Sequence, residues 1–230
     1  MLQLSLNGLR EGSELEQEEI RREFALRHCV FLRGFLSSTL LGRIKGLIKN
    51  QEYFTRIDLD REGKVFAREV TLSGSDPLAN LMFLLLNQKD LFDLIENVTE
   101  LEKPMRYFRS RVYEFHPNPD HYDSWHDDDE KGQTIGLSIN LSPDPMDGGE
   151  FEIRSASTQE VYKKVSGSCF GDAHLFRIGS EFEHRVLPVR GANPRRSCAG
   201  WFCTKPDYRV EIKKMLMTPK PDQGGDVSKS

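Results

Sequence analysis

The spacing of hydrophobic and polar residues changes near Pro104. In 37–48 and again in 78–98, apolar residues recur every three or four positions, which is the period of an amphipathic helix. After Pro104, short stretches rich in apolar residues alternate with turn-forming residues, a pattern typical of β-strands. The chain is therefore predicted to fold as a helix-rich first half followed by a strand-rich second half.

Local features predict where the elements of the first half begin. Ser37 or Ser38 can cap a helix that extends to Ile48, and Ser75-Asp76-Pro77 begins another helix, because a capping residue is followed by proline. A run that is first acidic and then basic predicts a surface helix over 11–22. The predicted strands of this half lie at 2–6 and 28–32 and, as two strands joined by a turn at 61–64, within 53–72.

The second half contains about eight candidate strands and few helical patterns. Two prolines exclude regular pairing from 116–120, and Asp147-Gly148-Gly149 predicts a tight turn. Such a series of short strands after helices predicts an α+β fold: a double-stranded β-helix (a cupin-like jelly roll) buttressed by the N-terminal helices. The strands are predicted at 105–115, 122–128, 134–141, 150–154, 160–165, 168–177, 183–189 and 196–204.

Length and composition predict how the chain is divided. At 230 residues and 26.5 kDa, one domain over 1–214 is expected, with helical support in about 1–104 and a jelly-roll core in about 105–206. The segment 215–230 is rich in Pro, Lys, Gly and Ser and is predicted to be disordered. No apolar run reaches the ~18 residues of a membrane span, and the first residues do not resemble a signal peptide.

The cysteines and the net charge indicate the expected cellular compartment and the class of binding partner. The four cysteines form no CxxC pair, which argues against zinc, and without a secretion signal they are expected to be reduced thiols in a cytoplasmic protein. A net charge of −4 argues against nucleic acid as a partner, because phosphate binding needs clustered positive charge. The sequence predicts no oligomeric state.

Three residues have the types and spacing of a metal site. His126 and Asp128 share a face if they lie on a strand, and His184 follows 56 residues after Asp128, far enough for several strands to return it. Two imidazoles and one carboxylate form the facial triad that favours Fe(II). A second His-x-Asp triplet, His121-Tyr122-Asp123, is less favoured because it directly follows the proline-containing loop. The competing interpretation is that 127–130 is a solvated acidic turn and that His184 is structural.

A candidate carboxylate-binding site lies farther along the chain. Arg195 and Ser197 share one face of a strand, so a guanidinium and a hydroxyl could hold the same carboxylate. Tyr113 could donate to that carboxylate from a neighbouring strand. Two arginines on an exposed strand are the alternative interpretation.

Taken together, His126-x-Asp128, His184 and Arg195-x-Ser197 resemble the 2-oxoglutarate/Fe(II)-dependent dioxygenases, and specifically their prolyl-4-hydroxylase-like branch. Placing the basic residue at Arg195 rather than Arg196 or Arg190 rests on Ser197 and on the six-residue step to Trp201. The resemblance covers roughly residues 28–204. Further matching motifs are Phe35-Leu36-Ser37, Ser138-Ile139-Asn140-Leu141, Gly148-Gly149-Glu150-Phe151, His184 to Val189 and Gly191 to Phe202.

The resemblance implies a reaction and its cofactors. Fe(II) would be held by His126, Asp128 and His184, and the far carboxylate of the cosubstrate 2-oxoglutarate by Arg195, Ser197 and Tyr113; O2 is the oxidant, and ascorbate is a possible addition. The enzyme would hydroxylate an unactivated C–H of an amino-acid-like or peptidyl (prolyl-type) substrate and release succinate and CO2. Because Asp128 is present, hydroxylation is favoured over halogenation.

Three other functions are compatible with parts of the pattern. One is a non-catalytic metal-binding jelly-roll interaction module, and another is an oxygenase acting on a small natural-product metabolite. A nucleic-acid demethylase of the same superfamily is disfavoured, because Trp201 stands where those enzymes carry a second arginine and because the chain is acidic. The expected partner is therefore a small molecule or a peptide, with no nucleic acid and no membrane.

Overall fold

The structure is a computed structural model that describes residues 1–48, 51–59, 62–73, 75–118, 121–130, 132–205, 212–213 and 216. The predicted disorder of 215–230 therefore falls outside the described residues, apart from Leu216. None of the helices in the described part of the chain has both the length and the hydropathy needed to cross a bilayer.

In the described part of the chain, three of four helices begin at a side chain that caps their first turn, whereas Gln88, before the fourth, makes no such hydrogen bond. Ser13 accepts a hydrogen bond from the backbone of Glu16, so the first helix begins later than predicted and then continues far enough to bury Ile20 and Phe24. Asp76 accepts from the first backbone N–H groups of the third helix, as its sequence predicts. The helices are α1 (Glu14–Arg27), α2 (Ser38–Ile48), α3 (Pro77–Leu86) and α4 (Lys89–Thr99).

Strands dominate the chain after α4, and the described residues also form five before α3. Those before α3 are β1 (Gln3–Ser5), β2 (Gly8–Arg10), β3 (Cys29–Leu32), β4 (Tyr53–Leu59) and β5 (Val65–Leu72). Those after α4 are β6 (Tyr107–Phe115), β7 (Tyr122–His126), β8 (Gln133–Asn140), β9 (Asp147–Gly148), β10 (Phe151–Ser155), β11 (Val161–Val165), β12 (Ala173–Arg177), β13 (Phe182–Val186), β14 (Val189–Arg190) and β15 (Arg195–Cys203).

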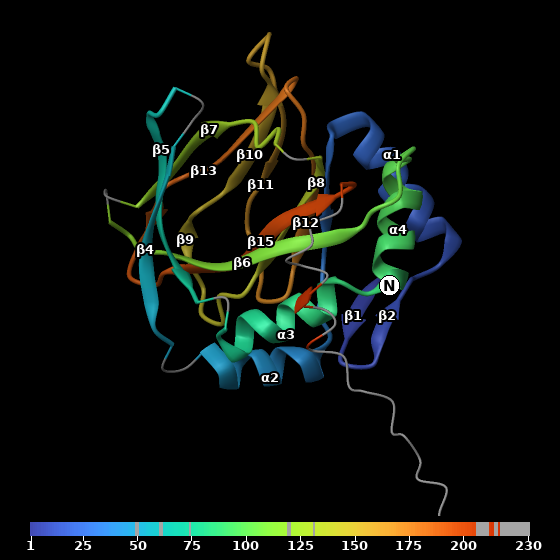
Figure 1. The fold of residues 1–230 in the computed structure, drawn as a ribbon, viewed down its shortest axis with the longest axis horizontal. Helices are drawn as coiled ribbons and strands as arrows, with labels where there is room; N and C mark the ends of the chain where they lie inside the picture. The colour runs from blue at the N-terminus through green and yellow to red at the C-terminus, as the bar shows by residue number, and fades with distance from the viewer. Residues whose placement is uncertain are drawn as a thin grey trace, which may run out of the picture.

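In the described part of the chain, eleven strands form one antiparallel sheet. Its order is β11-β10-β13-β7-β5-β6-β15-β8-β12-β3, with β4 paired to β5. The sheet curves around an interior, as Figure 1 shows, and the predicted jelly roll buttressed by helices is confirmed. The first half contributes more than helical support, since β3, β4 and β5 belong to this same sheet.

Three predicted strands have different bounds. The predicted strand 168–177 begins only at Ala173, because a turn at Phe170 and Gly171 precedes it. The predicted strand 183–189 is divided into β13 and β14 by Leu187 and Pro188, and β14 pairs with β9 in a separate two-stranded sheet. The predicted strand 122–128 ends at His126. Asp128 follows with φ +52°, in the left-handed region that non-glycine residues rarely adopt.

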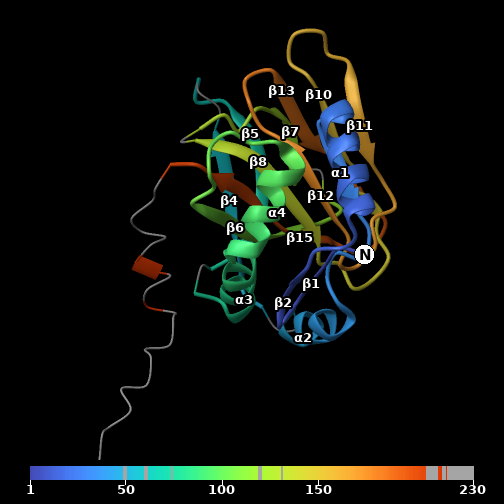
Figure 2. The same ribbon diagram turned by 90° about the vertical axis from the view of Figure 1, so that its right-hand side faces the viewer.

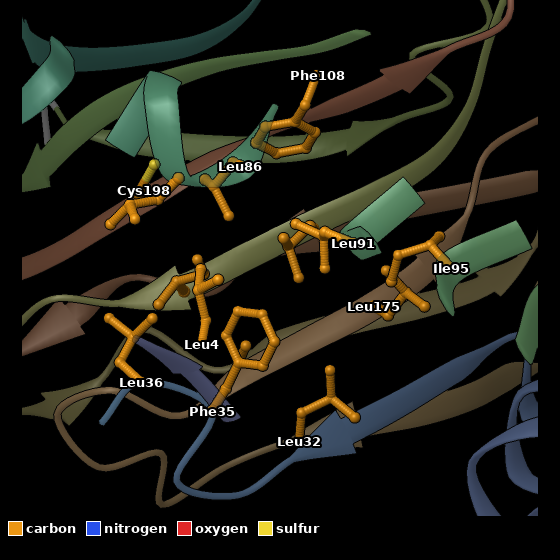
Figure 3. Close-up of a cluster of buried hydrophobic side chains, with 14 of the residues drawn as sticks. Leu4, Leu32, Phe35, Leu36, Leu86, Leu91, Ile95, Phe108, Leu175 and Cys198 are labelled. Carbon is orange, nitrogen blue, oxygen red and sulfur yellow. The ribbon is translucent and has the colours of Figure 1, made fainter. Parts of the chain in front are cut away.

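The main core lies between the helices and one face of the sheet. Figures 1 and 2 show α1 and α4 on one side and α2 and α3 at the base. Figure 3 shows Leu86 and Leu91 of the helices near Phe108, Leu175 and Cys198 of the strands. Successive strand residues face opposite sides, so the other face of β6 and β15 points into the curved interior, where the candidate site lies.

Candidate active site

The three predicted metal ligands meet at one place in the curved interior. His126 and His184 are partners across β7 and β13, and their ring centroids are 4.2 Å apart. Asp128 reaches them from beyond the end of β7: its Oδ2 lies 3.2 Å from Nε2 of His184 and 3.5 Å from Nε2 of His126. One ligand atom from each residue lies within 4.8 Å of the others. The turn at Asp128, rather than a continued strand, produces this convergence.

The ring of His126 is oriented by its own strand. Its Nδ1 lies 2.7 Å from the carbonyl oxygen of Ser124 and 3.2 Å from Oδ1 of Asp123. The carbonyl oxygen of Ser124 accepts from Nδ1, so Nδ1 carries a proton and Nε2, the nitrogen nearer Asp128, is the atom that can bind a metal. The Trp201 indole in turn donates to Oδ2 of Asp128 at 2.6 Å. The site thus has the outer hydrogen bonds that typically fix metal ligands.

The electrostatics of this cluster suit a bound cation. Burial opposes a charged His126 ring, but Asp123 and Asp128 outweigh it and raise the pKa of His126 to about 10. Burial would raise the pKa of Asp128, yet the two histidines hold it well below its usual value. Burial and the neighbouring His126 lower the pKa of His184. Two carboxylates therefore attract positive charge here, and the donor set of two imidazoles and one carboxylate fits Fe(II).

Arg195 forms the second predicted part of the site. It is buried at the start of β15, where its Nη1 donates to Oγ of Ser197 at 3.0 Å and its Nη2 to Oγ of Ser138 at 3.4 Å. Burial lowers its pKa to about 10, although Asp123 and Glu69 oppose that shift. No carboxylate among the described residues lies within 4 Å of it. A buried guanidinium without a counter-ion is costly, so this position fits the carboxylate of a ligand.

The alternative arginines face elsewhere. Arg196 forms an ion pair with Glu114, and Arg190 is exposed beside Asp147 and Glu150. Of the three arginines that the sequence left open, Arg195 is therefore the one that lines the interior cavity.

Tyr113 lies in the same wall as Ser197, its partner across β6 and β15. Its hydroxyl is 3.5 Å from Nη1 of Arg111. Burial, together with Glu69, raises the pKa of Tyr113, so the hydroxyl keeps its proton and remains a hydrogen-bond donor. The structure thus brings Tyr113 to the predicted neighbourhood, beside the cavity that Arg195 also lines.

Two residues of the site were not assigned a role from the sequence. Asp123 belongs to the triplet that was set aside, yet its carboxylate holds His126, while His121 of that triplet accepts from the backbone of His116. His174 on β12 is buried beside Arg195 in a small cavity of about 20 Å³, and its Nε2 has no partner among the described residues. Burial and the nearby Arg195 lower the pKa of His174 to about 3, so its ring is neutral. The sequence indicated the position of His174 only in one way: it lies two residues before Phe176 on a predicted strand, so the two side chains share a face.

A cavity of about 510 Å³ connects these groups. The metal cluster, Arg195 and Tyr113 line it, as do residues of the β4–β5 hairpin such as Asp58 and Glu69. This volume lies within the range of small-molecule pockets. The arrangement can therefore hold a metal ion, a carboxylate and a further ligand in one cavity.

Comparison with known proteins agrees with this geometry. Residues 108–203 match the model of the 2OG-Fe(II) oxygenase superfamily. No curated protein matches the chain. Residues 108–203 extend from β6 to β15 and contain the whole candidate metal cluster and Arg195.

Solved structures share the fold at low sequence identity. An oxidoreductase of the 2OG-Fe(II) oxygenase family from Burkholderia pseudomallei has a TM-score of 0.63 and 16% identity, over 89% of this chain and 96% of that one. A prolyl hydroxylase from Trichoplax adhaerens, in complex with a peptide fragment, has a TM-score of 0.58 and 14% identity, over 90% and 98%. The non-haem α-ketoglutarate-dependent epimerase SnoN of nogalamycin biosynthesis has a TM-score of 0.59 and 14% identity, over 94% of each chain.

Proposed function

We propose that this chain is a member of the 2-oxoglutarate/Fe(II)-dependent oxygenase superfamily, whose model matches residues 108–203, and that it hydroxylates an unactivated C–H bond of an amino-acid-like or peptidyl, prolyl-type substrate. Succinate and CO2 are the co-products. The observation that carries the proposal is the convergence of His126, Asp128 and His184 beside a cavity that Arg195 also lines, with no carboxylate of the described residues within 4 Å of its guanidinium.

Each residue of the site has a proposed task. His126, Asp128 and His184 hold Fe(II), which, when bound, supplies O2 activation coupled to decarboxylation of 2-oxoglutarate. Ser124 and Asp123 fix the ring of His126 through Nδ1, and Trp201 fixes the carboxylate of Asp128. Because these hydrogen bonds fix the metal-binding side chains, the metal would be held in one position relative to the substrate. Such positioning is the main contribution that a protein makes to cofactor chemistry.

The same wall of the barrel positions the cosubstrate. Arg195 and Ser197 bind its far carboxylate by charge-assisted hydrogen bonds, because both lie buried and face the cavity. Tyr113 donates its retained proton from the neighbouring strand.

The decisive experiment removes the carboxylate of the proposed triad. We expect Asp128→Ala to abolish Fe(II)-dependent succinate formation from 2-oxoglutarate, measured across a panel of amino acids, peptides and metabolites. Asp129→Ala is the matched control, since Asp129 is an exposed acidic residue of the same turn. Circular dichroism establishes that both variants fold. Turnover in Asp128→Ala at the rate of the unmodified protein would remove this iron assignment.

One observation favours a small natural-product metabolite as the second candidate substrate. SnoN, a neighbour with the same fold, is an epimerase of nogalamycin biosynthesis. Including such metabolites in the panel separates the two candidates, because succinate release then depends on which compound is supplied.

A further inference from the structure

Two arginines face the cavity at the end remote from Arg195. Arg109 and Arg111 are alternate residues of β6, so both point to the interior, and both line the cavity. Their guanidinium carbons lie 5.0 and 5.7 Å from the centre of the Trp201 ring. The two cations therefore share one aromatic surface, and that indole hydrogen-bonds Asp128.

We propose that Arg109 and Arg111 bind a carboxylate of the substrate. This inference rests on the proposed hydroxylase function and specifies its substrate class. The substrate is a free amino acid or another small carboxylic acid, or the C-terminal residue of a peptide. An internal peptide residue that carries no carboxylate of its own does not fit this site.

The partners of the charged groups support an anion at this position, although carboxylates outnumber arginines in the lining of the cavity. Glu183 is 2.7 Å from Arg154 and Asp58 is 2.7 Å from Arg56, while Asp123 and Asp128 lie beside the histidines of the metal cluster. By contrast, no carboxylate among the described residues lies within 4 Å of Arg109 or Arg111. Two like charges on one face of a strand repel each other, and a bound anion between them relieves that repulsion.

Stacking on Trp201 leaves most hydrogen-bond donors of Arg109 and Arg111 without a protein partner among the described residues. Nη2 of Arg109 donates to Gln133 at 2.9 Å, and Arg111 makes only a long contact of 3.5 Å with the Tyr113 hydroxyl among the described residues. Each guanidinium carries five donors, so most of this hydrogen-bonding capacity is unused by the protein. Half-buried cations with unused donors are typical of an anion site.

Arg109 and Arg111 lie farther along the wall of the cavity than Arg195. They pair with Trp201 and Ala199, which are six and four residues from Arg195 on β15, and this corresponds to roughly 13 to 20 Å along a strand. The carboxylate that Arg195 would hold therefore does not reach them, and the other carboxylate of 2-oxoglutarate would be bound by the metal, so an anion at the pair belongs to another molecule.

The distance from the pair to the metal cluster limits the size of the substrate. Trp201, on which the pair stacks, donates to Asp128 at 2.6 Å, and Gln133, which accepts from Arg109, donates to the Asp128 carbonyl at 2.8 Å. The bound carboxylate therefore lies about one side chain away from the proposed iron position. The reacting carbon must be within a few bonds of that carboxylate, as it is in a free amino acid.

Binding is tested with matched acids and amides. The full chain is loaded with Mn(II) in place of Fe(II) and with 2-oxoglutarate under anaerobic conditions, so that no turnover occurs. Thermal shifts and dissociation constants are measured for the L-amino acids and small monocarboxylic acids, and for the corresponding amides. We expect at least one free acid to bind tenfold or more tightly than its amide.

Substitutions test whether the two arginines cause the preference for the free acid over its amide. We expect Arg109→Gln/Arg111→Gln to weaken binding of the acid by about 10- to 100-fold and to equalise acid and amide. Arg109→Lys/Arg111→Lys retains a preference for the acid, which separates lost charge from lost packing on Trp201. Arg43→Gln, on the exposed surface of α2, is the control. The affinity for 2-oxoglutarate stays unchanged in every variant.

Four results would overturn the inference. They are equal binding of acid and amide to the unmodified protein, no binding by any acid of the panel, an unchanged acid preference in the double glutamine variant, and loss of 2-oxoglutarate binding in that variant. Failure of the proposed function is read separately: the unmodified protein would then show neither stabilisation by 2-oxoglutarate nor Fe(II)-dependent succinate formation.

Discussion

Glu69 is a buried carboxylate in the wall of the cavity. Its nearest described cation is Arg56, whose Nε lies 3.6 Å away and which also pairs with Asp58. Burial raises the pKa of Glu69 well above its usual value, and the nearby Asp123 and Asp58 add to the shift. The folded protein therefore binds a proton at Glu69 more readily than the unfolded chain does.

This shift has a defined sign for stability. Stability is lost as pH rises above the unfolded-state pKa of Glu69, because the folded state then pays for a buried charge. We expect Glu69→Gln to raise the Tm at pH 8 by about 2–4 °C, the change that ~1 kcal/mol produces in a chain of this size. At pH 4 the two proteins should unfold at the same temperature. A lower Tm for the variant at pH 8 would mean that the pair with Arg56 outweighs burial.

At the level of residues, the sequence indicated which side chains lie together where a motif is local, but not where side-chain orientation depends on distant strands. The types and spacing of His126, Asp128 and His184 were sufficient to select three residues that the structure brings together. The part played by Asp123 was not predictable, because it depends on the irregular pairing of β7 with β13. His174 was missed because only the folded sheet places it beside Arg195.

At the level of elements, capping signals located helices better than they fixed their length. Asp76 followed by Pro77 marked the start of α3 correctly. The end of α1 was placed too early, because burial of Phe24 against the rest of the fold, rather than local charge, keeps that helix intact to Arg27. The strands after Pro104 were predicted close to their observed positions. Apolar and polar residues alternate along a strand when one of its faces packs against the core and the other lines a polar interior.

The cap of α3 can be tested by substitution. Asp76 accepts hydrogen bonds from Leu78 at 2.7 Å and Ala79 at 3.4 Å, so Asp76→Ala leaves these backbone donors unsatisfied. We expect a loss of about 1 kcal/mol in the free energy of unfolding, measured by urea denaturation. Ser75→Ala is the matched control, because Ser75 is exposed and its hydroxyl contacts only Ser73 among the described residues. Equal loss in both variants would contradict the role of the cap.

At the scale of the whole molecule, ligand binding is linked to the free energy of unfolding, because the residues of the site come from several strands of one sheet. β7 and β13 carry the proposed iron ligands, and β15 carries Arg195. Ligands that hold these strands together should therefore stabilise the entire fold by mass action.

We expect Mn(II) with 2-oxoglutarate, each at about 100 times its dissociation constant, to raise the Tm by about 10–20 °C in two increments of about 5–10 °C. Chelation of the metal with EDTA should reverse the shift. Arg195→Gln should keep the increment due to Mn(II) and lose the increment due to 2-oxoglutarate. The measurement is differential scanning fluorimetry, and an unchanged 2-oxoglutarate increment in the variant would argue against the role of Arg195.

The β4–β5 hairpin occupies a special place in this sheet. β5 pairs with β7 through Ala67 and Arg68 and with β6 through Val70 and Thr71, so it joins the strand that ends at His126 to the strand that carries both substrate-facing arginines. Yet the hairpin contributes neither a proposed iron ligand nor Arg195. The sequence of the hairpin can therefore change without changing the proposed iron ligands or Arg195. A hairpin of different sequence would alter which substrates enter the cavity. Both laboratory redesign and natural divergence could use such a change.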